Sequence, residues 1–170
     1  MRPVTVVLTL PVVVLLAQPL WAPQWGAGIL GELRLLGPAG AVLAVVAFLV
    51  LVALYCRTLQ RLAELVPPDR RAESPRAVWW MFAVPFNFVE DFFIVRAIAR
   101  TLRADGRAAP GDVRIWLATG IGWCVLQIAS LLPGPVGVVT GGLALALWGV
   151  HWVHTVRIDR GLRAAATVGA

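Results

Sequence analysis

Four long apolar runs constrain this chain more than any other feature. They cover residues 4–21, 35–56, 115–132 and 134–156, and none contains Asp, Glu, Lys or Arg. A helix of about 18 residues rises roughly 27 Å, enough for the roughly 30 Å hydrocarbon core of a bilayer. The chain is 59% hydrophobic and 14% charged, whereas soluble domains have about 45–50% and about 25%. The sequence therefore predicts an all-α integral membrane protein.

The first run has a second interpretation as a signal peptide. Arg2 precedes a stretch rich in Val and Leu, which is the order of a secretory signal. Leu20-Trp21-Ala22 matches a small-residue cleavage site poorly. We expect residues 1–22 to be retained as a helix, and their removal stays an alternative.

The arginines decide how the chain crosses the membrane. All fifteen cationic side chains are arginine, and residues 77–89 form an apolar run that is too short to span. If this run spanned, the arginines would divide nine to six between the two sides. If it returned to the side it left, fourteen would share one side and only Arg34 the other. The positive-inside rule favours the second arrangement, with both termini cytoplasmic.

The predicted architecture is two transmembrane helical hairpins that flank a broken middle segment. The middle segment, residues 77–104, is interrupted by Pro85 and is expected to be a re-entrant or interfacial amphipathic helix. Residues 161–170 are expected to form a short disordered tail. A composition rich in Ala, Val, Leu, Gly, Pro and Arg is typical of a GC-rich genome, so we expect the bacterial inner (cytoplasmic) membrane. Because most arginines flank apolar runs, the pI near 11.2 indicates lipid contact and no nucleic-acid partner.

Polar residues after Pro85 predict a helix from about Phe88 to Ala104. Asn87 is a favoured N-cap, and Glu90 and Asp91 add negative charge to the first turn. Asp105-Gly106 supplies a stop. The assignment predicts that Asn87→Ala costs about 1 kcal/mol of local helix stability.

The same polar residues allow a structural and a functional interpretation. On a helical wheel Asn87, Glu90 and Asp91 share one side of this helix. Capping accounts for them, but a broken helix at membrane depth is also where transporters hold ions and substrates. The opposite side is expected to contact lipid phosphates through three arginines, Arg96, Arg100 and Arg103.

The middle segment also resembles a known family. Trp79-Trp80, four residues, Pro85, one residue, Asn87 and then Arg96-Ala97-Ile98 are similar to the centre of a family of small bacterial membrane proteins of unknown function. That family carries a Trp-Trp…Pro…Asn element between two hydrophobic hairpins. The resemblance covers about residues 75–105 and implies an architecture, with no activity.

The histidines are the only cofactor candidates. His151 and His154 lie three residues apart in the last apolar run, so they cannot both ligate one haem from opposite sides. A single-histidine ligand to a haem or a chlorophyll-type pigment is one interpretation, and an interfacial histidine without a cofactor is the other. Cys56 and Cys124 have no metal-site spacing, so no metal site is expected.

Small residues predict a packing surface on the last helix. Gly137, Gly141 and Gly142 let another backbone approach closely, either the neighbouring helix of the same hairpin or another protein. No catalytic motif occurs in the sequence. We therefore expect a non-enzymatic accessory or interaction subunit of a membrane complex, or a homo-oligomer. A small channel, carrier or sensor that uses Asn87, Glu90 and Asp91 is the alternative, and a haem- or pigment-associated subunit is the third.

Overall fold

The computed structural model describes residues 2–25 and 35–168, and the side chains as far as residue 165. Every regular element in these ranges is a helix, which confirms the all-α part of the predicted fold class. In chain order the elements are α1 (Pro3–Leu16), α2 (Gln18–Trp21), η1 (Pro23–Trp25), α4 (Gly37–Glu64), η2 (Pro68–Arg70), η3 (Pro75–Phe82), α5 (Asn87–Asp105), α6 (Pro110–Ala129) and α7 (Pro135–Val168). Arg34, the single arginine predicted outside, lies beyond the described residues.

Two helices, α4 and α7, are long and apolar enough to cross a membrane. The first predicted span, residues 4–21, is instead divided into α1 and α2, and α1 has 14 residues. Pro19 explains the break, because it has no N–H to donate to the carbonyl of Leu15 and its ring would clash there. Pro11 lies inside α1 without ending it.

The last helix is longer than the sequence predicted. α7 continues to Val168 and so includes most of residues 161–170, for which we expected a disordered tail; residues 169 and 170 lie beyond the described part. Ile158 and Leu162 are buried one turn apart on its inner face. Packing of these two side chains onto the core stabilises the helix as it enters this segment.

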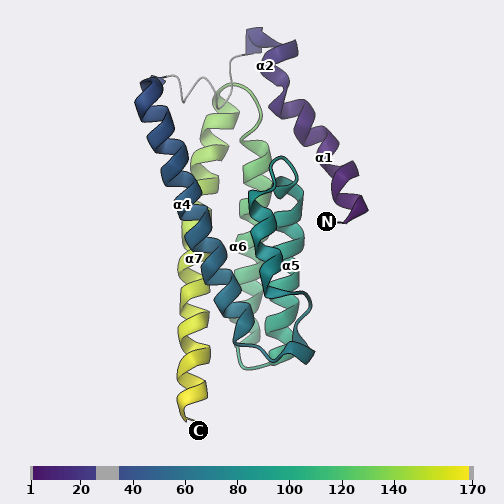
Figure 1. The fold of residues 1–170 in the computed structure, drawn as a ribbon, viewed down its shortest axis with the longest axis vertical. Coiled ribbons are helices and arrows are strands. Elements are labelled where there is room, and N and C mark those ends of the chain that lie inside the picture. Colours follow the sequence, from purple (N-terminus) through teal and green to yellow (C-terminus); the bar gives the residue numbers. More distant parts are fainter. Residues whose placement is uncertain (1, 26–34, 169–170) are drawn as a thin grey trace.

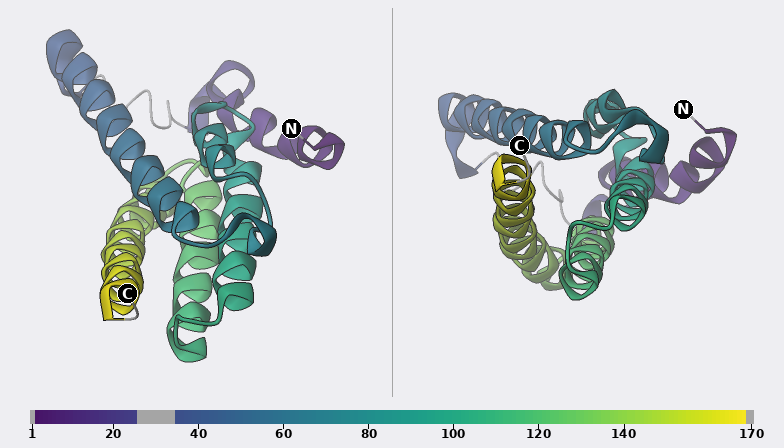
Figure 2. Two further views of the ribbon diagram at one scale, coloured as in Figure 1. Left: turned by 60° about the horizontal axis from the view of Figure 1, so that its bottom comes forward. Right: turned by 90° about the horizontal axis from the view of Figure 1, so that it is seen from below.

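The main helices form an upright bundle (Figure 1). α4 and α7 run in one direction, α6 runs in the other, and α5 lies beside α6. The N-terminal half of α4 diverges from the other helices (Figure 2), and the buried residues of α4 begin only at Tyr55. On α4, the buried residues therefore all lie in the C-terminal part of the helix.

The segment η3–α5 is a hairpin that begins and ends at the same end of the bundle. Arg107 donates a hydrogen bond of 2.8 Å to the carbonyl of Leu65, and Arg70 donates one of 3.4 Å to the carbonyl of Asp105. These bonds join the loop after α4 to the loop after α5. We call this end, where α7 also finishes, the arginine-rich end.

The helix α5 matches the predicted range to within one residue at each end, but its N-cap residue differs from the prediction. It starts at Asn87 and stops at Gly106, whose φ of 75° is left-handed and suits glycine. The N-cap is Phe86, and no side chain caps the helix, so the assignment of Asn87 as cap was wrong. The chain already turns before this point: Asn87 N–H donates to the carbonyl of Ala83. Asn87 is therefore a helical residue.

Candidate functional site

A group of buried polar side chains lies where α4, α5, α6 and α7 meet. Each has a buried nitrogen or oxygen atom to which the described residues give no hydrogen-bond partner. An unpaired polar atom in a protein interior costs about 1–3 kcal/mol, so such atoms normally bind water, a proton or an ion. We call this group the polar core. Its members are Tyr55, Asp91, Gln127, Trp148 and His151; at the start of α5, Asn87 Oδ1 is likewise unpaired among the described residues.

Asp91 carries the ionisable carboxyl group of the polar core. It is 2% exposed, near the start of α5. The side-chain amide of Gln127 on α6 hydrogen-bonds to it, while its Oδ1 has no partner among the described residues. Burial raises the pKa of the Asp91 carboxyl well above its usual range; the Gln127 hydrogen bond opposes this shift, and the charge of Glu90 adds to it. Asp91 is thus a buried carboxyl group with one oxygen unpaired among the described residues.

Tyr55 on α4 forms the aromatic wall of the polar core. Its side chain is fully buried, and its ring makes edge contacts with the rings of Trp123, Trp148 and Trp152 at 5.5–5.7 Å between centroids. The Tyr55 phenol lies near the Asp91 carboxyl, and its hydroxyl has no hydrogen-bond partner among the described residues. Both are therefore buried polar groups in the same part of the bundle.

Glu90 is adjacent to Asp91 in the sequence, but its side chain has a different environment. Thr5 of α1 donates a hydrogen bond of 2.6 Å to Glu90 Oε1, and Arg2 Nη1 lies 4.0 Å from Oε2. Arg2 also pairs with Glu73 and lies 4.3 Å from the centre of the Phe93 ring. The structure therefore divides the predicted ligand group: Glu90 fastens α1 to the hairpin, whereas Asp91 faces the polar core.

His151 is enclosed by aromatic rings. It is fully buried, its Nδ1 is 3.0 Å from the hydroxyl of Thr119, and the Trp116 ring centre is 4.4 Å away. A methyl group added at Gly120 would lie only 2.8 Å from Cε1 and 3.2 Å from Nε2. The packing on that side leaves no space for a macrocycle, so the structure gives the haem or pigment interpretation no support at His151.

His154 lies in other surroundings, half-buried beside a groove at the arginine-rich end. The two histidines, three residues apart in sequence, are thus not members of one site. Within residues 2–25 and 35–165, no three His, Cys, Asp or Glu side chains are placed to hold a metal ion.

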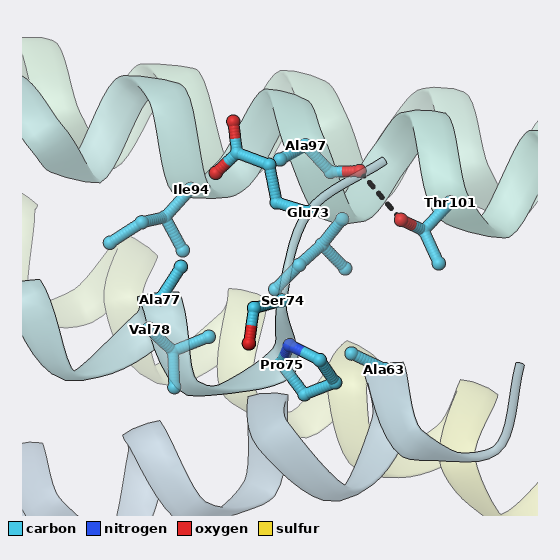
Figure 3. Close-up of a pocket in the computed structure, with 10 residues that line it drawn as sticks. Ala63, Glu73, Ser74, Pro75, Ala77, Val78, Ile94, Ala97 and Thr101 are labelled. Carbon is cyan, nitrogen blue, oxygen red and sulfur yellow. Dashed lines mark hydrogen bonds between the residues drawn. The ribbon is translucent and has the colours of Figure 1, made fainter. Parts of the chain in front are cut away.

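A small pocket lies between η3 and α5 (Figure 3). Its walls include Val78, Ile94 and Ala97, and the hydroxyl of Thr101 at one side is bonded to the carbonyl of Ala97. The volume is about 20 Å³. This is room for about one water molecule, so the pocket does not accommodate an organic ligand.

Two of the three glycines predicted for a packing face are used within the α6–α7 hairpin. A methyl group added at Gly137 would collide with the carbonyl oxygen of Leu132, and one added at Gly141 would contact Ser130 at 3.5 Å. Gly142 has open space around it and is exposed. The three arginines of the lipid-contact prediction, Arg96, Arg100 and Arg103, are all exposed on the outer side of α5.

Several residues of the site were not singled out from the sequence. Tyr55, Gln127 and Thr5 each stand inside an apolar run. A polar side chain in such a run needs a partner inside the protein. The position of all three residues in the sequence therefore already indicated polar contacts within the bundle.

Comparison with family models, curated proteins and solved structures finds no match for this chain. The resemblance of residues 75–105 to the Trp-Trp…Pro…Asn family therefore rests on the quoted residues alone.

Proposed function

We propose that the chain is a multi-pass protein of the bacterial inner membrane whose arginine-rich end faces the cytoplasm. The distribution of exposed side chains supports this orientation. The exposed large apolar residues of α4 end at Leu54, shortly before Arg57, and those described on α7 end at Val153, shortly before Arg157. Such a boundary is where a hydrocarbon core gives way to lipid headgroups.

In this orientation the η3–α5 hairpin dips in from the cytoplasmic side and returns. Trp79 and Trp80 are both more than 40% exposed on η3, as expected for indoles at a membrane interface. Reporter fusions at residues 60 and 108 test the arrangement. Both reporters should be cytoplasmic, and reporters on opposite sides would overturn it.

Within this membrane protein we propose that Asp91 is a reversible proton-binding group of a non-enzymatic carrier or sensor. One observation carries the proposal: the carboxyl is buried, with no cation beside it and one oxygen unpaired among the described residues. A carboxylate cannot remain charged in such a place without a large desolvation cost, so it binds a proton. The surrounding Tyr55 and Gln127 supply polar groups that respond when the proton leaves.

Infrared difference spectroscopy of the reconstituted protein tests this assignment. We expect a protonated-carboxyl band at neutral pH that is missing from Asp91→Asn. Asp69→Asn is the matched control, since Asp69 is exposed on η2, and it should leave the band unchanged. A spectrum without the band, or a band that survives in Asp91→Asn, would refute the proton site. Proton flux into liposomes then separates a carrier, which shows flux that Asp91→Asn abolishes, from a sensor.

A second candidate is the accessory or interaction subunit of a membrane complex. The exposed face of α7 favours it, because Gly142 and Gly149 both have open space where a side chain would be. Small residues at such spacing allow another helix to approach closely. In mild detergent, Gly142→Leu should disrupt an oligomer or release a co-purified partner, while Val139→Leu, on an exposed neighbouring position, should not. A wild-type chain that purifies only as a monomer without partners would end this candidate.

A further inference from the structure

A groove lies between the beginning of α6 and the last turns of α7. Its volume is about 220 Å³, about eleven times that of the small pocket between η3 and α5, which is about 20 Å³. Three of its lining residues are polar: Asp112 comes from α6, and His154 and Arg157 come from α7. The other three, Ala108, Ile158 and Gly161, are small or apolar. Polar side chains from both helices therefore line the groove.

The two charged residues of the groove have opposite sign and do not neutralise each other. Among the described residues neither Arg157 nor Asp112 has an ion-pair partner within 4.0 Å. His154 adds a ring N–H donor on the same side as Arg157, three residues earlier on α7. One wall thus donates hydrogen bonds and the other accepts them, so the complementary ligand carries both an anionic and a cationic group.

The position of the groove along α7 indicates which ligand of this kind it can reach. Val153 is the last large exposed apolar residue described on α7, and the groove residues His154 and Arg157 follow it directly. In the membrane orientation proposed above, the groove therefore opens at the level of the cytoplasmic lipid headgroups. Basic pockets between helices at this level bind phosphate-bearing headgroups.

We propose that this groove binds the zwitterionic phosphoethanolamine group of a phospholipid. Arg157 and His154 donate hydrogen bonds to the phosphate oxygens, and the carboxylate of Asp112 accepts from the primary ammonium group. The inference goes beyond the proton site, since it involves none of the polar core residues, but it depends on the proposed membrane placement.

The same chemistry predicts the selectivity among phospholipids. Phosphatidylglycerol offers the same phosphate but has uncharged hydroxyl groups where Asp112 would meet the ammonium group. Phosphatidylcholine has a quaternary ammonium with no N–H to donate to the carboxylate. Phosphatidylethanolamine alone of the three brings a charged hydrogen-bond donor to Asp112 as well as a phosphate to the other wall.

Native mass spectrometry of the detergent-purified full chain, with these three lipids carrying identical acyl chains, tests the proposal. We expect phosphatidylethanolamine to be retained most strongly. Arg157→Gln should weaken its binding about tenfold, the equivalent of one charge-assisted hydrogen bond. Asp112→Asn should remove the preference over phosphatidylglycerol. Arg160→Gln and Asp69→Asn are the matched controls, because both side chains are exposed and neither lines the groove.

The source of the headgroup is tested separately with water-soluble glycerophosphoethanolamine. Competition by this compound shows that the groove recognises the headgroup itself, and an absence of competition combined with lipid retention shows that the acyl chains are also required. Equal retention of the three lipids, or unchanged binding by Arg157→Gln, would overturn the proposal. If Arg157→Gln does not fold, Arg157→Lys, which keeps the charge and loses the bidentate geometry, takes its place.

Failure of the groove and failure of the topology are distinguishable. If the reporter fusions contradict the membrane orientation, the binding of glycerophosphoethanolamine still tests the groove by itself. Lipid binding without selectivity, in a chain whose reporters are both cytoplasmic, contradicts the groove and leaves the topology intact.

Discussion

Thr5 and Glu90, 85 residues apart, form a buried hydrogen bond of 2.6 Å between α1 and α5. The bond lies near the start of α1, where Arg2 also pairs with Glu73. Beyond this point α1 exposes large apolar side chains such as Val7, Leu8 and Leu10. Polar contacts at its first turns, rather than a broad apolar face, therefore hold α1 to the hairpin.

Thr5→Val should loosen α1 without unfolding the bundle. The substitution keeps the shape of the side chain and leaves Glu90 Oε1 without its donor, a loss of about 1–3 kcal/mol. Hydrogen exchange of the α1 amides should accelerate, while exchange in α6 and α7 stays unchanged. Thr140→Val is the control, because the Thr140 hydroxyl bonds only to carbonyls of its own helix. Equal protection of α1 in wild type and Thr5→Val would contradict this role.

Gly120→Ala should destabilise the core, whereas Gly142→Ala should not. At Gly120 the new methyl group would lie 2.7 Å from Val95 and 2.8 Å from His151; at Gly142 it would meet nothing within 4 Å. Alanine improves helix propensity by about 1 kcal/mol at either position, so the difference between the two variants isolates the collision. We expect that difference to be about 1–3 kcal/mol, measured by thermal unfolding in detergent. Two variants of equal stability would show that the contact of α5, α6 and α7 at Gly120 is looser than described.

The sequence contained enough information to predict an all-helical chain. Apolar runs predicted helices, and the arginine count predicted that the chain enters and leaves the η3–α5 hairpin on one side. The hydrogen bonds of Arg70 and Arg107 join the two ends of this hairpin, and its placement in a membrane stays a prediction. A single proline, Pro19, divides the first predicted span, and packing onto the core stabilises the extension of α7. A hydropathy pattern averages over many residues and predicts neither feature.

The site was only partly predictable for a related reason. Asp91 and Glu90 were identified as a pair, because a helical wheel places neighbours within about 100° of each other. Their partners come from α1, α4 and α6, and sequence periodicity within one helix does not specify which helix lies against which side. Tertiary contacts therefore gave the two carboxyl groups different environments.

A double-mutant cycle should detect the hydrogen bond between Trp116 and Thr155. The indole N–H of Trp116 donates 2.9 Å to the Thr155 hydroxyl, and both side chains are fully buried. Thr155→Val leaves that N–H unpaired and should cost about 1–3 kcal/mol, whereas the further change Trp116→Phe removes the unpaired donor. The coupling energy should be about 1 kcal/mol, measured by unfolding in detergent. Strictly additive losses would argue that the bond contributes nothing to stability.

Asn87→Ala should leave the start of α5 unchanged, contrary to the capping assignment from sequence. No side chain caps this helix, and Asn87 is its first helical residue. Since alanine has the better helix propensity, we expect a change within about 0.5 kcal/mol, read from hydrogen exchange of residues 88–92. Gly106→Ala is the comparator at the other end of α5, where a φ of 75° should cost about 1–2 kcal/mol with a Cβ present. A loss of about 1 kcal/mol in Asn87→Ala, the size of a missing N-cap, would restore the capping role.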